Sequence, residues 1–510
     1  MSRKLCPILA FILAACSSSQ SGGPKPAGEA GGAGGKATAG GSAGVRGSAG
    51  NGGATGESGG AGGSVTGDGG AGSVTGGGGG ATGGSSGAGG SATGGSGGAT
   101  GAGGADATAA TGYKFGARPQ QYPMGSIRPT GEQGELDAAV KAVYDKWKAA
   151  YVQAQCGGYI VKNPTSAEPV RPNILTNSTA LGNGMVITAM MAGHDPEAQT
   201  IFDGMFAVAR KFPSILSHYV PPKHGIGPRA ENQYLLAYAI GNECKTVFDD
   251  HSEVNGDLIF AYALAVADKQ WGSTGEVNYL DELKKTVNAI KLYDMSRLKT
   301  PLIGDWATLP GEGMWTTVSK PQNFMVGAFR SFGKASGDMY WMEVVDAIQT
   351  LIADVQMRYS PMTGLFSRYL IASRNLPGGN TVLNGRDINS RDHFGDAGPI
   401  PLWLAADYIG SGDMRSKVAF SKITDWIKTK TDGDPSKIVD GYRLNGDNIG
   451  TKGTMAFVAP FGAIAAFDAG NQPWLDAIWK LMSTAPTTSE PADSANVMGM
   501  LMVTGNWWQP

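Results

Sequence analysis

The sequence has almost no excess charge of either sign. Its 41 lysines and arginines nearly balance its 43 aspartates and glutamates, so the formal net charge is −2. Neither a basic stripe nor a basic cluster stands out along the chain. Proteins that bind nucleic acid need concentrated positive charge to neutralise phosphates. The composition therefore gives no electrostatic reason to expect nucleic acid as a partner.

Residues that commonly bind metals are also scarce. The chain has 4 cysteines and 5 histidines, which are scattered and form no CxxC pair or other zinc-type spacing. We therefore expect neither a metal nor another cofactor. Two cysteines lie close to the N-terminus, which leaves Cys156 and Cys244. Whether these two form a disulfide stays open at this point, because a bridge requires close Cα atoms and spacing alone does not give that distance.

No apolar run near the N-terminus is long enough to span a bilayer. Arg3 and Lys4 precede a short apolar run at 7–15, which is typical of a signal peptide. The run ends in LAAC at 13–16, which resembles the lipobox of bacterial lipoproteins. The resemblance implies cleavage after residue 15 and acylation of Cys16, hence a lipid anchor in the cell envelope. We expect the outer membrane, on its periplasmic or external side; the alternative is an ordinary secretory signal with a chance cysteine.

Aromatic and branched apolar residues are nearly absent from 21–112, where many of the 80 glycines lie. Such a segment cannot bury enough apolar surface to offset the entropy lost on ordering. We expect 16–112 to be a flexible tether with a span on the order of 50 Å. The predicted organisation is a signal peptide at 1–15, this tether, and one folded domain at 113–510.

The rest of the chain has the periodicity of helices. Apolar residues recur three and four positions apart, as at Leu136, Val140 and Val143, and so share one helix face. Thr130 is expected to cap this first helix. The predicted helical segments are 133–153, 182–193, 197–211, 256–269, 277–292, 321–335, 338–357, 399–409, 413–429, 453–468, 472–484 and 491–503. About twelve helices without an internal repeat favour an all-α (α/α)6 barrel over a solenoid.

Several segments, in this order, resemble glycoside hydrolase family 8. They are ELDAAVKAVYDKWKAAYV at 135–152, GNGMVITAMMAGHDPEAQTIFDGMFAVAR at 182–210, NGDLIFAYALAVADKQWGS at 255–273, NFMVGAFRSFGKASGDMYW at 323–341 and DAGPIPLWLAADYIGSGD at 396–413. The resemblance extends over nearly all of 113–510. It implies an (α/α)6 barrel and inverting hydrolysis of β-1,4-linked glucan, xylan or chitosan.

The family's acid motif is altered in this chain. Inverting hydrolysis needs a protonated acid and an ionised base, roughly 6.5–9.5 Å apart across the scissile bond. The family's acid is the glutamate of SEGxGYGM, and here 178–185 reads STALGNGM. Thr179 therefore stands at the acid position and Asn183, expected to contact the substrate, at that of the tyrosine. A threonine hydroxyl is no useful proton donor near neutral pH, and general acid catalysis typically contributes about 10²- to 10⁴-fold in rate.

Two further motifs depart from the family pattern. The family's Asp-Gly-Asp reads NGD at 255–257. The resemblance implies that Asn255 can hydrogen-bond a sugar at the cleavage subsite but brings no charge there. Asp257 is expected either to bind substrate or to cap the following helix. Asp396 matches the family's base, but both arginines of that motif are missing. It is therefore a possible base, a ligand-binding carboxylate or a structural one. Arg368 occupies a place where family members tend to have aspartate.

Trp306 and Trp315 lie near predicted loops, where their rings are expected to stack on sugars; the alternative is that they belong to the core.

Three altered motifs predict a surface-tethered, monomeric protein that recognises β-1,4-glycans and whose catalysis is weakened or lost. The first alternative is an active endo-β-1,4-glycanase with a substitute acid; the loop candidates are Glu231, Glu253 and Glu312, each otherwise a solvated surface residue. The second alternative is a surface scaffold without a sugar ligand.

Overall fold

The computed structural model describes residues 113–163, 174–247, 250–372, 375–377 and 391–510. The signal peptide, the lipobox with Cys16 and the tether lie outside these residues and stay predictions. None of the helices in the described ranges combines the length and hydropathy needed to cross a membrane.

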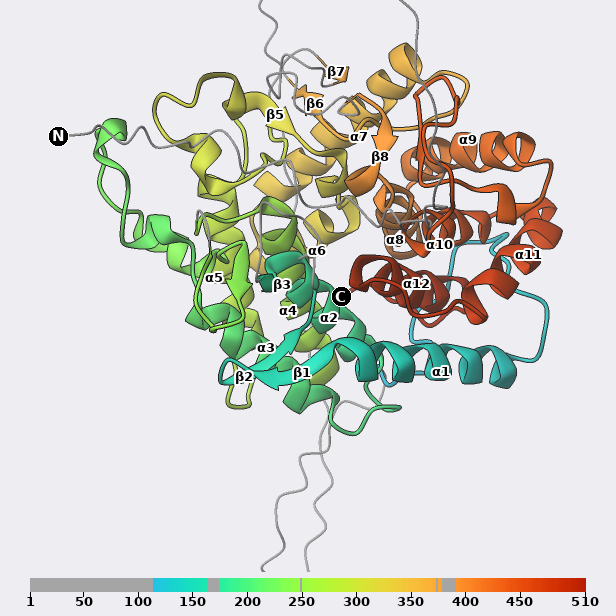
Figure 1. The fold of residues 1–510 in the computed structure, drawn as a ribbon, viewed down its shortest axis with the longest axis horizontal. Helices are drawn as coiled ribbons and strands as arrows, with labels where there is room; N and C mark the ends of the chain where they lie inside the picture. The colour runs from blue at the N-terminus through green and yellow to red at the C-terminus, as the bar shows by residue number, and fades with distance from the viewer. Residues whose placement is uncertain (1–112, 164–173, 248–249, 373–374, 378–390) are drawn as a thin grey trace, which may run out of the picture. The chain divides into compact units, whose positions relative to one another are not determined.

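In the part of the chain that the structure describes, twelve α-helices form an inner and an outer layer (Figure 1). The inner helices each contact the next, and the last returns to the first, which closes a ring. They are α2 (Ser178–Met190), α4 (Val254–Trp271), α6 (Val326–Ser336), α8 (Ile400–Ser411), α10 (Met455–Ala465) and α12 (Glu490–Val503). The outer helices are α1 (Gln133–Tyr151), α3 (Ala198–Lys211), α5 (Tyr279–Tyr293), α7 (Tyr340–Tyr359), α9 (Met414–Lys430) and α11 (Gln472–Ser483). The expected (α/α)6 barrel and all its helical segments are confirmed.

The two layers differ in how the sequence buries them. The inner helices α2 and α4 are buried on nearly every side, whereas the outer helices α3 and α5 have one buried stripe and one exposed face. Close packing between α2 and α4 depends on two glycines. A Cβ on Gly256 would lie 2.1 Å from the Ser178 hydroxyl oxygen, and one on Gly182 would lie 2.9 Å from Ile259. The motif glycines therefore hold two inner helices together.

Short strands precede several inner helices. The sheets are β1 (Val152–Gln155) with β2 (Gly158–Val161); β3 (Ile174–Asn177) with β4 (Ala239–Gly241); β5 (Val318–Ser319) with β6 (Leu370–Ile371) and β7 (Leu376–Pro377); and β8 (His393–Phe394) with β9 (Gly441–Tyr442). All pairings are antiparallel. Strand β3 runs directly into α2, whose first turn is capped by the Asn177 side chain, which accepts a hydrogen bond from the Ala180 N–H at 2.8 Å. The strands thus fix where the inner helices begin.

A disulfide joins Cys156 and Cys244, with 5.1 Å between their Cα atoms. It connects the turn between β1 and β2 to the turn that follows β4. Of the two possibilities left open by the sequence, the structure has the bonded one. Because β4 pairs with β3, the disulfide also secures the strand that leads into α2.

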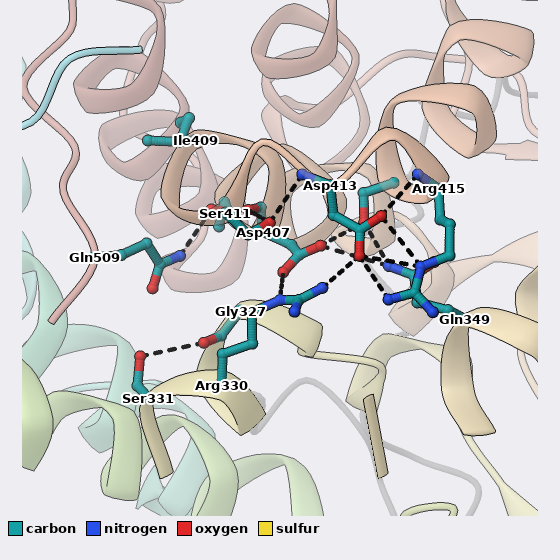
Figure 2. Close-up of polar contacts among 12 residues, drawn as sticks. Gly327, Arg330, Ser331, Gln349, Asp407, Ile409, Ser411, Asp413, Arg415 and Gln509 are labelled. Carbon is teal, nitrogen blue, oxygen red and sulfur yellow. Dashed lines mark hydrogen bonds and ion pairs between the residues drawn. The ribbon is translucent and has the colours of Figure 1, made fainter. Parts of the chain in front are cut away.

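An ion-pair network links four helices, α6, α7, α8 and α9, and Figure 2 shows the contacts around Arg330, Asp407 and Asp413. Arg330 on α6 donates to the fully buried Asp407 on α8 at 2.8 Å and to Asp413, before α9, at 2.5 Å. Arg415 on α9 bonds Asp413 and also Asp346 on α7, the latter at 2.8 Å. The bidentate geometry of guanidinium groups suits such bridging between helices.

The expected cap of the first helix is wrong. Helix α1 begins at Gln133 after Glu132, whose side chain makes no capping bond, so Thr130 lies too early in the chain to reach the free N–H groups. Thr130 instead binds Asp476 on α11 through its N–H at 2.7 Å and its hydroxyl at 2.8 Å.

We expect the double variant Cys156→Ser/Cys244→Ser to lose about 2–4 kcal/mol of unfolding free energy. The reason is that the bridge constrains an unfolded loop of 88 residues. Urea unfolding of the variant and of the unmodified protein, with and without reductant, measures the difference. Reductant should lower the midpoint of the unmodified protein alone; equal midpoints for both proteins without reductant would contradict the prediction.

A second prediction concerns Glu490, which is buried at the start of α12. Burial raises its pKa to about 7, the nearby Asp493 adds to the rise, and the Ser494 hydroxyl, donating at 2.7 Å, offsets part of it. In the unfolded chain a glutamate titrates near pH 4.3, so the folded state is stabilised by the proton below that pH and loses this stability as pH rises through 7.

Glu490→Gln keeps the acceptor for Ser494 and removes the ionisation. We expect the variant to be more stable than the unmodified protein by up to about 3 kcal/mol at pH 8, with a smaller difference at pH 5. Urea unfolding at several pH values measures this. Glu135→Gln, at an exposed position of α1, is the control and should leave the unfolding free energy unchanged at both pH 8 and pH 5. A Glu490→Gln difference that does not vary with pH would show that packing, not ionisation, is responsible.

Candidate functional site

The predicted site residues meet at the N-terminal ends of the inner helices. Thr179 lies in the first turn of α2 and Asn255 in that of α4, while Asp396 lies in the 3-10 turn η8 (Gly395–Ala397) before α8. A further turn, η6 (Pro321–Asn323), precedes α6 and contacts α4, η8 and α8. The ring of inner helices thus brings together motifs that are far apart in the sequence.

Thr179 contacts two residues, Asn255 on α4 and Glu253 just before α4. Its hydroxyl donates a hydrogen bond to Asn255 Oδ1 at 3.3 Å, and its Oγ1 lies 3.5 Å from Glu253 Oε2. Thr179 and Asn255 are therefore side by side, and Glu253 brings a carboxylate next to the Thr179 hydroxyl.

Lys320, which sequence reasoning missed, lies between the two carboxylates of the site. Its Nζ is 2.7 Å from Glu253 Oε1 and 3.0 Å from Asp396 Oδ2, and its side chain is only 3% exposed. Because both oxygens contact the same nitrogen, they lie closer together than the roughly 6.5 Å that inverting enzymes keep between their carboxyl groups. Lys320 is a single lysine in a loop, with no partner at a regular spacing, so the sequence contained no signal for its position.

Arg368 continues the chain of alternating charges on the other side of Asp396. Its Nε and one terminal nitrogen each lie 3.1 Å from Asp396 Oδ1. The sequence showed Arg368 as a departure from the family but did not show that Asp396 is its partner. The charges of these four residues, two cations and two anions, cancel one another.

The ion pairs keep Lys320 and Asp396 charged. Burial by itself would raise the pKa of Asp396, but attraction to Arg368 and Lys320 outweighs it and lowers the pKa well below its usual range. Burial would likewise lower the pKa of Lys320, but attraction to Glu253 and Asp396 raises it well above its usual range. Asp396 is thus ionised, as a base must be, but its affinity for a proton is weakened.

Asp257 lies in the first turn of α4, two residues after Asn255. It is fully buried, and its Oδ1 accepts a hydrogen bond from the backbone N–H of Leu236 at 2.7 Å. Burial raises its pKa and that of the adjacent Asp294, which is further raised by repulsion from Asp257. This bond to Leu236 differs from the expected helix cap, and a sugar would reach Asp257 only after local rearrangement. Contact with substrate therefore stays a prediction for this residue.

Asn183 lies one turn after Thr179 on α2 and so shares its helix face. It is 8% exposed, which leaves a small part of its surface accessible to solvent. Trp306 and Trp315 are partly buried, in the 3-10 turns η4 (Asp305–Thr308) and η5 (Gly313–Thr317). Their ring centres are 5.5 Å apart in an edge-to-face arrangement. The two rings form one aromatic pair, partly supported by the core and partly accessible.

Of the three glutamates considered as a substitute acid, Glu253 is the one with a contact to Thr179. Glu231 accepts a hydrogen bond from the Tyr293 hydroxyl at 3.0 Å. Glu312 lies 3.7 Å from Lys223 Nζ and 3.8 Å from His224 Nε2. Within the ranges that the structure describes, no group of three or more His, Cys, Asp or Glu side chains is arranged to hold a metal ion.

Known proteins with similar sequences and structures identify the family. No protein-family model matches the chain. An endoglucanase of Bacillus sp. (strain KSM-330) is 35% identical over 399 residues, which cover 77% of this chain and 81% of that protein. A β-glucanase of Niallia circulans is 34% identical over 392 residues, covering 76% and 89%.

The structures agree with the sequences. A β-1,3-1,4-glucanase from Paenibacillus sp. X4 matches with a TM-score of 0.71 and 33% identity, covering 79% of this chain and all (100%) of that one. A cold-adapted family 8 xylanase matches with a TM-score of 0.58 and 18% identity over 76% of this chain and 98% of that one, which shows the shared fold. The chain belongs to glycoside hydrolase family 8. In this chain the site places Thr179, Asn255 and Lys320 around the carboxylates of Glu253 and Asp396.

Proposed function

We propose that this family 8 protein recognises β-1,4-glycans, and that hydrolysis by the family's inverting route is weakened or lost. The observation that carries the proposal is the position of Lys320, whose ammonium group lies between Glu253 and Asp396 while a neutral hydroxyl occupies the acid position. A site with this arrangement is suited to binding sugar hydroxyls rather than to transferring protons.

The chemistry of inverting hydrolysis supports this proposal. A protonated carboxyl must donate to the leaving oxygen, and an ionised carboxylate on the opposite side must activate water. Thr179 cannot supply the proton, and Glu253 is already engaged by a cation, since it accepts a hydrogen bond from Lys320 at 2.7 Å. Asp396 is ionised, but two cations reduce its capacity to take a proton from water.

The remaining polar and aromatic groups fit a binding role. The amides of Asn183 and Asn255 and the hydroxyl of Thr179 can exchange hydrogen bonds with sugar hydroxyls. The partly accessible rings of Trp306 and Trp315 can pack against the apolar face of a sugar.

The location in the cell is part of the proposal. A lipid on Cys16 would anchor the chain to a bacterial membrane, the outer membrane in our proposal, and the Gly-rich segment at 16–112 would hold a monomeric domain away from the surface. A glycan-binding domain on such a tether would retain polysaccharide at the cell surface.

A second candidate function is an active endo-β-1,4-glycanase that uses Glu253 as its acid. The distance of 3.5 Å between Glu253 Oε2 and Thr179 Oγ1 favours this candidate, because it brings a carboxyl to the lost acid's position. Glycan binding would have to separate Glu253 from Lys320 so that the carboxyl could take up a proton.

We predict that the full chain, purified in mild detergent, binds β-glucan, xylan or chitosan in affinity electrophoresis but releases no reducing ends from them. Thr179→Glu should gain hydrolysis, by about 10²-fold or more over the background, because it restores a carboxyl at the acid position. Thr179→Gln, which has the same size and no acidic proton, is the matched control and should stay inactive.

The other outcomes separate the alternatives. Turnover by the unmodified chain that disappears in Glu253→Gln would establish the second candidate. Neither binding nor turnover by any of these proteins would instead support a surface scaffold without a sugar ligand.

A further inference from the structure

The charges of the site bear on which glycans it accepts. Polymers of glucose or xylose are neutral, whereas a polymer of glucosamine carries ammonium groups at mildly acidic pH. An ammonium group on a sugar is held by a carboxylate that lacks a cation of its own. Whether Glu253 and Asp396 are already paired with cations of the protein therefore decides whether a cationic sugar can bind.

We propose that Lys320 is a specificity-determining residue that restricts the site to neutral glycans and excludes glucosamine polymers. The proposal rests on the proposed function, since it names the class of glycan that the same site recognises. Lys320 occupies, from within the protein, the position between two carboxylates that the ammonium group of a sugar would otherwise take.

Both carboxylates are already neutralised. Glu253 is paired with Lys320, and Asp396 is paired with Lys320 and Arg368. An incoming ammonium group would find no carboxylate without a cation among them, so it would have to compete with a cation that is already bound. A neutral sugar meets no such competition, and its hydroxyls can donate to the free lone pairs of the carboxylates and accept from nearby N–H groups.

Lys320 is held in place by the elements on either side of it. The preceding residue, Ser319, belongs to β5, which pairs with β6, and its hydroxyl donates to the Pro301 carbonyl at 2.5 Å. The following residue, Pro321, begins η6, and the ammonium group also lies 5.7 Å from the centre of the Tyr369 ring. With a side chain 3% exposed, the lysine cannot swing into solvent without moving these elements.

Other acidic residues considered for this site offer no substitute. Glu231 is bonded to Tyr293, and Glu312 lies near Lys223 and His224. Asp257 is fully buried. Removing Lys320 alone would therefore create the uncompensated carboxylate that a cationic sugar needs.

The test is calorimetric titration of the full chain in mild detergent, at pH 5.5, with hexamers of β-1,4-linked glucose, xylose and glucosamine. We expect a neutral hexamer to bind at least about tenfold more tightly than the glucosamine hexamer. Equal or tighter binding of the glucosamine hexamer by the unmodified chain would overturn the proposal. Binding of none of the three would overturn the proposed function itself, so the two failures are distinguishable.

Lys320→Met then tests the residue. We expect the ratio of the affinity for the glucosamine hexamer to the affinity for a neutral hexamer to rise about tenfold over that of the unmodified chain. Lys320→Met/Glu253→Gln removes both charges of the pair and should show no such gain. Lys299→Met, which removes a more exposed lysine paired with Glu343, is the control outside the site and should behave like the unmodified chain.

An unchanged preference in a folded Lys320→Met variant would overturn the assignment to Lys320. Thermal unfolding of each variant verifies folding. If Lys320→Met does not fold, the comparison of the three hexamers on the unmodified chain still decides whether cationic glycans are excluded, and Lys320→Arg, which keeps the charge, should retain that exclusion.

Discussion

The contacts of the Lys320 ammonium group are the constraint on which the site depends. A buried lysine is stable only when carboxylates surround it, and here Glu253, before α4, and Asp396, before α8, do so. Lys320 itself precedes η6 and α6. One cation therefore links the starts of three neighbouring inner helices, and loss of either carboxylate would leave charge buried without a full set of partners.

Helix packing and the charges of the site depend on different residues. Gly256 and Gly182 allow α2 and α4 to approach where a Cβ would collide. Thr179 and Asn255, at the ends of the same two helices, are neutral, and the charges beside them form ion pairs around Lys320. In our proposal, the helix packing of the family 8 framework is therefore kept while proton transfer is weakened or lost.

Much of this could be predicted from the sequence, and the exceptions have physical reasons. The helical segments followed from apolar spacing, and Thr179, Asn255 and Asp396 do meet at one site, as the motif order implied. Lys320 could not be found, because a buried ion pair depends on residues more than sixty positions away. The Thr130 cap failed because the helix begins later than the pattern suggested, and a contact to α11 binds Thr130 instead.

The sequence by itself determined the helical fold class and the chemical identity of the groups at each motif, because helix periodicity is local and a threonine cannot act as a carboxylic acid. Only the tertiary structure decided that Cys156 pairs with Cys244, that Asp257 is buried and that Lys320 lies between two carboxylates. These outcomes depend on distances between segments far apart in the chain. Such distances are set by how the inner helices pack, and no local pattern contains them.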